Sequence, residues 1–529
     1  MAADVGTGAK GVEKENRAEL IKVSVQNAEE NNIDKIVYEE TFRICFEYDS
    51  PIDVLTAILL KNDKNASILK LIKDEKNQKL FYTEWIEIPL SEYAGVNKNE
   101  EKEDYNYKIH QTENAEKLTL SVKIKNDKRD VCEVFTFYRN YEEWIGINKN
   151  ETEFYEDFFI KKGTNVTKVV NEFIEELYKV KHTDIKAYNR IEELVEKKSA
   201  ALWQAALDDV KSDNLDDRPL YWGRNKMQVF LKRHPLFKND YDCDKSTIND
   251  NSDLQKLITL FEEKSRNYTG IDFSGASVGA KKILIIGFDP FFLNEKHPLY
   301  GQGSNIKQSN PSGVCALALH EQNLGNGYVQ TMIVPVRYTD FDSSKDNKSG
   351  QGEGIIEDYI KEWLSEVDMI ITVSQALPNQ YNIDVFATAT RGGTIDNMNF
   401  TREEGSKSVN ISSPETIVTT LPDEFTQAPS EAIFNGKYQL SKYESPLIAT
   451  KNNYPTTKVF NGPGGNYLSN EIFYRVAKLR KDLKPTLRTG HFHIAKLQNE
   501  NIKEDFNIGK TQNLLNIVKI AINKGISEL

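Results

Sequence analysis

A chain of 529 residues is too long for one ordinary hydrophobic core, so we expect two or three domains. Its hydrophobic fraction of 39% is enough to build these cores. The net charge of −12 at pH 7 argues against a protein that binds nucleic acid through its phosphates, because such a protein needs a basic face.

Residues 1–31 are polar, small or charged, and we expect a flexible lead. They contain no apolar core, which argues against a cleavable signal peptide. The longest apolar stretch, Ile283 to Leu293, is too short and too interrupted to span a bilayer, so no membrane association is expected. A cytoplasmic location is the default, and export without a cleavable signal peptide would leave the same pattern. The four cysteines show no CxxC spacing, which favours reduced thiols over disulfides or a zinc site.

Residues 32–150 are predicted to form strands. Short apolar or alternating runs are separated by Asn, Asp, Lys and Gly, in the order VYEETFRICFEY, DVLTAILL, KLFYTEWIEI, TLSVKIK and CEVFTFY. We expect an antiparallel, sandwich-like β domain. No catalytic constellation is visible in it, so we expect it to bind or dock to a protein partner.

Residues 151–272 change to the helical period, with apolar residues three and four positions apart. The predicted helices are NVTKVVNEFIEELYKV, YNRIEELVEKKSAALWQAALDDV and DLQKLITLFEEKS. Between the last two lies DDRPLYWGRNKM (216–227), where we expect the proline to break one helix and the aromatic pair to precede the next.

Residues 273–529 are predicted to form an α/β/α three-layer domain. The joint SGASVGA is followed by alternating strands and helices, with strands at KKILIIGFDPF, VQTMIVPVRY, DMIITVSQA, KVFNG and HFHIAKL. The helices are CALALHEQ, IIEDYIKEWLSEV and LSNEIFYRVAKLRK. Unbroken apolar strands of this kind favour a mostly parallel sheet covered on both faces. Sites in such sheets lie at the carboxyl ends of the strands.

Two motifs at strand ends are candidates for a binding recess. GFDPF brings Phe288 and Phe291 to the end of the first strand, and SNPSG places Asn310 at a helix start. Aromatic residues beside a strand end are more often part of the core. TVSQA places Gln375 at another strand end, where its amide offers a donor and an acceptor to an amide-like ligand. Asp384 follows in a loop, where an acidic residue is usually only solvated.

Two further motifs bring together a nucleophile and a base. GPGGNYLSNEIFYR feeds a Gly-rich turn into a helix that begins near Ser469, where free N–H groups and the helix dipole favour negative charge. An N-cap role is the alternative for this serine. In GHFHI, His491 and His493 point to the same face of a strand and can provide a general base, or can be structural. A zinc site needs a third ligand that the sequence does not place, so no metal is predicted.

The order of these motifs resembles that of pyroglutamyl peptidase I, over about 250 residues. In that family a Glu, a Cys and a His form the triad in this chain order, and Asp384, Ser469 and His493 stand at the matching positions. The resemblance also implies that Phe288 and Phe291 pack on the acyl ring and that Gln375 binds its amide. Arg391 lies near, but not at, the sequence position where that family has an arginine that helps to hold the oxyanion. DDRPLYW and GGNYLSNEI resemble a larger bacterial group of such proteins in which Ser replaces Cys.

The resemblance implies a C-terminal domain of the phosphorylase/hydrolase-like type, and a serine hydrolase that acts on a peptide or amide bond without a cofactor. Two departures bear on this. A serine hydroxyl needs a base within hydrogen-bond reach, whereas a thiol ionises more easily. Asp in place of Glu shortens the acid by roughly 1.5 Å. The alternative is an inactive pseudo-hydrolase that serves as a binding module, for example within a secretion or toxin-delivery assembly.

Overall fold

The computed structural model divides the chain into two compact units, residues 1–89 with 117–137 and residues 90–116 with 138–529. The structure describes residues 20–27, 32–33, 41–48, 57–61, 64–69, 71–83, 86–87, 116–124, 132–139, 155–232, 234–242, 247–293, 307–343, 352–392, 394, 396–398, 402, 406–407, 414–426, 431–497 and 508–529. Within these residues no helix is long and apolar enough to cross a membrane.

The described residues of the first unit lie mainly in strands. One sheet has the order β2-β1-β3-β7-β6 with β8 on β3, and the other has the order β10-β9-β4-β5. The strands are β1 (Leu20–Asn27), β2 (Asn32–Ile33), β3 (Thr41–Tyr48), β4 (Ala57–Lys61), β5 (Lys64–Leu69), β6 (Leu71–Lys73), β7 (Leu80–Thr83), β8 (Ile86–Glu87), β9 (Glu116–Ile124) and β10 (Cys132–Arg139). Cys45 and Phe81 are buried. A sandwich packing of the two sheets stays a prediction.

The second unit begins with helices. They are α2 (Tyr155–Ile160), α3 (Thr164–Tyr178), α4 (Ala187–Lys211), α5 (Arg218–Lys232), η2 (Pro235–Phe237) and α6 (Asp253–Ser265), with the short strands β11 (Tyr241–Asp242) and β12 (Thr247–Ile248) between the last two. The three helices predicted from the apolar period are confirmed as α3, α4 and α6. The prediction for DDRPLYW was wrong, because Pro219 lies in the first turn of α5 and the aromatic pair lies inside that helix. A proline is tolerated there since the first helical N–H groups have no partner.

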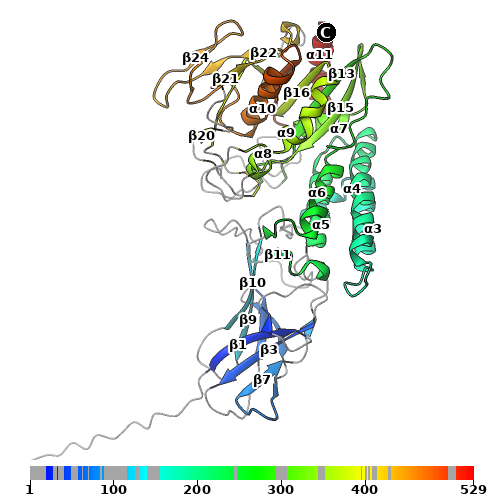
Figure 1. Cartoon of the computed structure of the whole chain (residues 1–529), viewed down its shortest axis with the longest axis vertical. Coiled ribbons are helices and arrows are strands. Elements are labelled where there is room, and N and C mark those ends of the chain that lie inside the picture. Colours follow the sequence, from blue (N-terminus) through cyan, green and yellow to red (C-terminus); the bar gives the residue numbers. More distant parts are fainter. Residues whose placement is uncertain are drawn as a thin grey trace, which may run out of the picture. The chain divides into compact units, whose positions relative to one another are not determined.

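A mixed seven-stranded sheet forms the centre of the remaining chain (Figure 1). Its order is β14 (Asn323–Leu324), β15 (Gly327–Val334), β13 (Lys281–Phe288), β16 (Met369–Gln375), β25 (Arg488–Ile494), β17 (Tyr381–Asp384) and β22 (Ala432–Asn435). Strands β15, β13, β16 and β25 are parallel, as the buried apolar runs predict. Strand β17 pairs antiparallel with β25, and β22 is parallel to β17. The sheet is therefore mixed.

Helices cover both faces of this sheet. Helix α10 (Leu468–Leu483) and helix α9 (Ile355–Ile360) share one core with Leu284 and Ile286. Helix α7 (Pro311–Leu319) lies on the opposite face, because a Cβ on Gly287 would lie 2.4 Å from Ser312 O. The other elements are α8 (Tyr338–Asp342), η3 (Lys361–Ser365), β18 (Phe386–Thr388), β19 (Thr390–Arg391), β20 (Ser406–Lys407), β21 (Thr416–Val418), η4 (Asp423–Thr426), β23 (Lys437–Tyr438), β24 (Leu447–Ile448) and α11 (Ile508–Ile526).

The sequence misplaced some of these elements. The strand predicted at KVFNG (458–462) was wrong, since these residues form only isolated bridges, from Asn461 to Gln439 and from Gly462 to Gly465. The sheet positions beyond β25 are taken by β17 and β22 instead, which the sequence did not indicate as strands.

Candidate active site

A cavity of about 750 Å³ opens at the ends of the central strands of the sheet. Six of the eight predicted site residues line it, and they come from five separate segments of the chain: Phe288, Phe291, Asn310, Gln375, Ser469 and His493. Asp384 lies behind His493, and Arg391 is not among the lining residues. The structure thus brings together candidate residues that are up to 205 positions apart, from Phe288 to His493.

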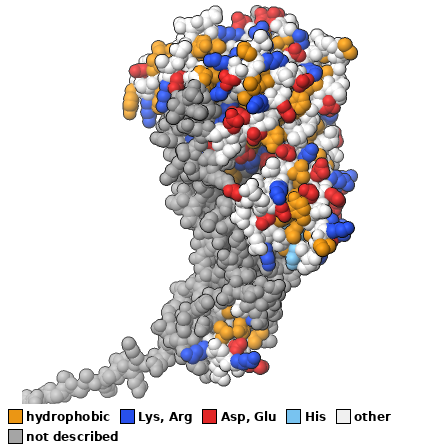
Figure 2. All heavy atoms as spheres, viewed as in Figure 1, with side chains coloured by type: hydrophobic (Ala, Val, Ile, Leu, Met, Phe, Trp, Pro, Cys, Tyr) orange, Lys and Arg blue, Asp and Glu red, His pale blue; other side chains and the backbone are white. Residues whose placement is uncertain are grey.

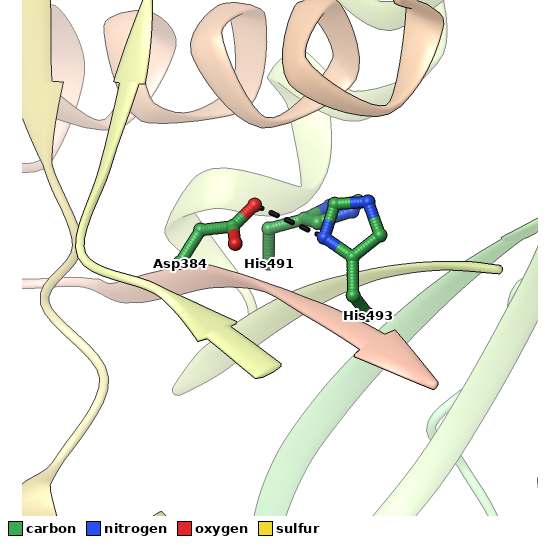
Figure 3. Close-up of side chains that lie close together, drawn as sticks. All are labelled: Asp384, His491 and His493. Carbon is green, nitrogen blue, oxygen red and sulfur yellow. Dashed lines mark ion pairs between the residues drawn. The ribbon is translucent and has the colours of Figure 1, made fainter. Parts of the chain in front are cut away.

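Asp384 and His493 form a pair between neighbouring strands (Figure 3). The distance from His493 Nδ1 to Asp384 Oδ2 is 3.1 Å, the aspartate side chain is fully buried and the histidine side chain is 12% exposed. Burial raises the pKa of Asp384, while the neighbouring imidazole lowers it in part. The other ring nitrogen, Nε2, points away from Asp384 (Figure 3). This arrangement holds the ring in one orientation and leaves Nε2 as a proton acceptor.

Ser469 lies in the first turn of α10, whose N-cap is Tyr467. Its hydroxyl donates a hydrogen bond to the backbone oxygen of Gly464 at 3.2 Å. The side chain is half-buried and lines the same cavity as His493. Because the first N–H groups of a helix have no partner within it, the backbone beside this serine can donate to an anionic oxygen.

The Gly-rich turn in front of α10 is fitted closely around the Asp384–His493 pair. A Cβ on Gly464 would lie 2.7 Å from Asp384 Oδ2, so only glycine leaves room for the carboxylate. Gly465 has a φ of 77°, a left-handed conformation that glycine adopts at no steric cost. At the other side of the turn, Asn435 Nδ2 donates to Pro463 O at 2.9 Å. The turn is thereby fixed to strand β22.

An aromatic recess forms one side of the cavity. Phe291 and Phe292 contact each other with centroids 4.4 Å apart, and Phe292 stacks on Tyr467 at 5.9 Å. Phe288 is nearly buried and stacks on Phe341, so it belongs to the core as well as to the cavity wall. Gln375 lines the cavity, and its buried Oε1 has no hydrogen-bond partner among the described residues. An amide N–H of a ligand would satisfy this oxygen.

Asn310 has a structural role that the sequence predicts in part. It is the N-cap of α7, accepting a hydrogen bond from Ser312 N at 3.0 Å, and its Nδ2 donates to Asp289 O. Its own N–H donates to Asp217 Oδ2 at 3.0 Å, at the start of α5. Its polar side-chain atoms are therefore engaged by the protein, which leaves it to shape the cavity wall.

Asp289, directly after β13, joins the helical segment to the sheet. Its two carboxylate oxygens lie 2.9 Å from Arg224 Nη1 and 2.7 Å from Arg266 Nη1, and all three side chains are buried. Buried charges need such complete pairing, because desolvation otherwise disfavours them strongly. The helices α5 and α6 thus hold the end of β13, from which Phe288 lines the cavity.

Arg391 lies beneath the first turn of α10 rather than in the cavity. Its Nη1 is 2.8 Å from Asp342 Oδ2 and 2.9 Å from Glu471 Oε1, and all three side chains are fully buried. Glu471 also pairs with Arg475 at 2.9 Å. Since both carboxylates already engage the guanidinium, Arg391 supports the helix that carries Ser469.

Strand periodicity alone does not choose between the two histidines, whereas the resemblance selects His493, and the structure places the two rings in different surroundings. His491 is fully buried, with Thr372 Oγ1 2.7 Å from Nδ1 and Ser374 Oγ 2.7 Å from Nε2. Burial holds its pKa well below the usual range. Its ring meets that of His493 edge to face at 4.4 Å. His491 is therefore a neutral ring that packs against the ring of His493, the candidate general base.

The potential metal ligands Asp384, His491 and His493 lie within 4.8 Å of one another (Figure 3). Asp384 is the third ligand that the sequence did not place. Both nitrogens of His491 already face hydroxyl groups, so a cation here would have to displace one of these hydrogen bonds. Two histidines and one carboxylate form a donor set that transition metals accept.

The outer wall of the cavity is the part that the sequence missed. It is formed by residues near β17, β22 and the hairpin of β23 and β24, together with Lys496 after β25. The contributing polar residues include Asn382, Asn435, Lys437 and Gln439. Nothing in their spacing indicated a site, because they come from short polar strands and turns.

Two family models match parts of the chain. Residues 282–455 match the model described as PA0049, C-terminal domain, and residues 152–246 match the model described as PA0049 N-terminal domain. The chain is also 27% identical over 237 residues to the uncharacterized protein PA0049 of Pseudomonas aeruginosa. That match covers 41% of this chain and 39% of the Pseudomonas protein, so it spans well under half of either.

Solved structures that are similar to this chain include peptidases. The pyrrolidone carboxyl peptidase from Thermococcus litoralis is 17% identical with a TM-score of 0.32, over 47% of this chain and 94% of its own. A mutant pyrrolidone carboxyl peptidase from Pyrococcus furiosus is 20% identical with a TM-score of 0.32, over 47% and 99%. Pyroglutamyl peptidase I of Bacillus amyloliquefaciens is 19% identical with a TM-score of 0.31, over 47% and 97%.

Proposed function

We propose that this protein is a serine hydrolase that cleaves an amide bond. The observation that carries the proposal is the 3.1 Å pair of Asp384 and His493 beside Ser469 in one cavity. Ser469 is the nucleophile, His493 the general base and Asp384 the residue that orients and stabilises the imidazole. This assignment agrees with the order of the motifs in the sequence.

The reaction begins when the Ser469 hydroxyl exchanges its hydrogen bond to Gly464 O for one to His493 Nε2. Oγ then attacks the carbonyl carbon while Nε2 takes the proton. Collapse of the tetrahedral intermediate breaks the C–N bond, and His493 gives its proton to the leaving nitrogen. His493 Nε2 then takes a proton from a water molecule, which attacks the acyl carbon. The bond from this carbon to Ser469 Oγ breaks, and His493 returns the proton to Oγ.

In this proposal the oxyanion accepts from backbone N–H groups between Gly465 and Asn470, whose own N–H groups already donate to Gly462 O and Tyr467 O. The partial positive charge of the helix N-terminus acts in the same direction. The acyl group occupies the recess of Phe288 and Phe291, and its amide faces Gln375 Oε1, the buried oxygen that has no partner among the described residues.

Labelling with a fluorophosphonate probe tests this function. We expect labelling of the wild-type chain and none of Ser469→Ala, with a loss of at least 10²-fold in rate for His493→Ala because the base is removed. The experiment is run with and without a chelator, since the metal-ligand geometry of Asp384, His491 and His493 offers another chemistry. Absence of both labelling and an acyl-enzyme burst would reject the proposal.

A second candidate function is a pseudo-hydrolase that binds an amide-containing partner without cleaving it. The observation in its favour is that the Ser469 hydroxyl donates to Gly464 O, with no hydrogen bond to His493 among the described contacts. In this case Ser469→Ala leaves ligand affinity unchanged and no probe reacts. The first unit, residues 1–89 with 117–137, would then add a docking site for a protein partner.

A further inference from the structure

The cavity extends across more strands than an acyl recess requires. In the sheet, β13 lies two places to one side of β25, and β22 lies two places to the other side. At about 4.8 Å per strand, the span from β13 to β22 is roughly 19 Å. Phe288 of β13 and Asn435 of β22 both line the cavity, with His493 of β25 between them. A substrate cleaved at His493 therefore has room on both sides of its amide bond.

The two sides differ in chemistry. The β13 side is aromatic, with Phe288, Phe291, Phe292 and Tyr467. The β22 side carries amide side chains and a lysine from the adjoining hairpin: Asn382, Asn435, Gln439, Asn461 and Lys437. Lys496, three residues after His493, also lines the cavity.

No aspartate or glutamate lies among the described residues that line the cavity, although the whole chain has 80 acidic residues and a net charge of −12. On the face of the molecule in Figure 2, basic and acidic side chains are intermixed over the described surface. The cavity thus combines two lysines and His493 with neutral walls. Charged residues of one sign in a cleft focus the field and favour ligands of the opposite charge.

Burial lowers the pKa of Lys496, because an ammonium group loses hydration inside the cavity. A ligand carboxylate beside this group would favour its charged form. Lys437 is exposed at the start of the β23–β24 hairpin and lines the same cavity. The amide side chains that line the cavity with these lysines match the donors and acceptors of a peptide.

We propose that the β22 side of the cavity binds an anionic leaving group, namely an amino acid or peptide with a side-chain carboxylate next to the cleaved bond. Lys437 and Lys496 pair with the carboxylate, and the neighbouring amides bind the peptide groups. This inference rests on the proposed hydrolase function and assigns its leaving-group specificity.

The test uses three C-terminally amidated dipeptides, pyroglutamyl-Glu, pyroglutamyl-Gln and pyroglutamyl-Lys. Glu and Gln have nearly the same shape and differ in charge, and Lys carries the opposite charge. We expect kcat/KM to fall in the order Glu, Gln, Lys, with at least a tenfold difference between the first and the last. Lys437→Glu should abolish or reverse this order. Lys442→Glu is the matched control, because Lys442 is exposed on the same hairpin and is not among the lining residues, so the order should persist.

Binding of the same dipeptides to Ser469→Ala separates the two proposals. Tighter binding of the Glu dipeptide supports the inference even if no dipeptide is cleaved, and lack of cleavage together with lack of probe labelling rejects the hydrolase function alone. Cleavage or binding that does not depend on the charge of the leaving residue overturns the inference while leaving the hydrolase function intact. Absence of both cleavage and binding overturns the inference as well. Lys496→Gln is a second variant, which removes a positive charge without adding a negative one. It should also weaken the preference for the Glu dipeptide over the Lys dipeptide.

Discussion

The Oδ1 atom of Asp217 lies 2.5 Å from the hydroxyl of Ser309, 92 positions further along the chain. Asp217 precedes α5, and Ser309 precedes the N-cap of α7. The carboxylate also accepts a hydrogen bond from the backbone of Asn310, and it is fully enclosed. The starts of two helices are thus joined by one acid, which fixes the loop at the edge of the cavity.

Asp217→Asn is expected to lower the free energy of unfolding by about 1–3 kcal/mol. An amide oxygen accepts one of the hydrogen bonds, but its NH₂ group faces a second donor, the N–H of Asn310. Urea denaturation measures the change. The control is Asp208→Asn on the exposed side of α4, where the loss should be under roughly 0.5 kcal/mol. Equal effects of the two variants would contradict the role given to Asp217.

Asp384→Asn should reduce kcat by roughly 10³–10⁴ while leaving the protein folded. The neutral amide cannot stabilise the imidazolium of His493. Apart from His493, neither carboxylate oxygen of Asp384 has a hydrogen-bond partner among the described residues, so removal of the buried charge costs the fold little. Steady-state kinetics and thermal unfolding together check this. A large fall in Tm with unchanged kcat would contradict it.

Gly464→Ala should lower kcat by about 10²-fold. The new Cβ would lie 2.7 Å from Asp384 Oδ2, so either the turn or the carboxylate must move. The same shift moves the backbone oxygen that Ser469 contacts. Kinetics with an activated ester measures the effect, and Tm reports whether the fold is intact. An alanine variant with wild-type kcat would show that the close approach has no catalytic consequence.

Folding stability should fall as the pH drops from about 6.5 to 4. Burial lowers the pKa of His234 and of His320 to about 4, so both are neutral in the folded state and take up protons on unfolding. Each ring accepts a backbone N–H, from Leu236 and from Thr331 respectively, which a charged ring could not do.

The contribution of each histidine is fully present above pH 6.5 and is lost progressively below it, up to roughly 3 kcal/mol per residue. His320→Asn retains an acceptor but does not titrate. Between pH 4 and 6.5, the unfolding free energy of this variant should therefore change less steeply with pH than that of the wild type. The two slopes should differ by about 1.4 kcal/mol per pH unit. An unchanged slope in urea titrations at several pH values would contradict the assignment.

The helical period and the unbroken apolar strands predict much of the second unit from sequence. Helices α3, α4 and α6 and strands β13, β15, β16 and β25 follow from local patterns that do not depend on distant partners. The sequence also indicated Ser469, His493 and Gln375, because each lies near the start or the end of a predicted helix or strand. Asp384 was expected in a loop and instead ends the four-residue strand β17.

The remaining features depend on partners far away in the chain. Strands β17 and β22 are four residues each, too short for a reliable alternation. Arg391 was expected beside the oxyanion, but its place is set by Asp342 and Glu471, which sequence spacing does not reveal. The lysines of the outer wall carry no local pattern at all. Tertiary pairing, rather than propensity, decided these positions.

The bond from Asn435 to Pro463 closes the base of the segment that carries β23 and β24, since both of its ends are tied together there. Within it, Gly436 O accepts from Ala449 N at 2.8 Å. Residues 437–460 are not independent of the site, because Tyr438 and Tyr454 contact Phe386, two residues after Asp384. A hairpin transplanted between related chains would therefore leave the reacting groups in place only if it kept these two aromatic contacts with Phe386.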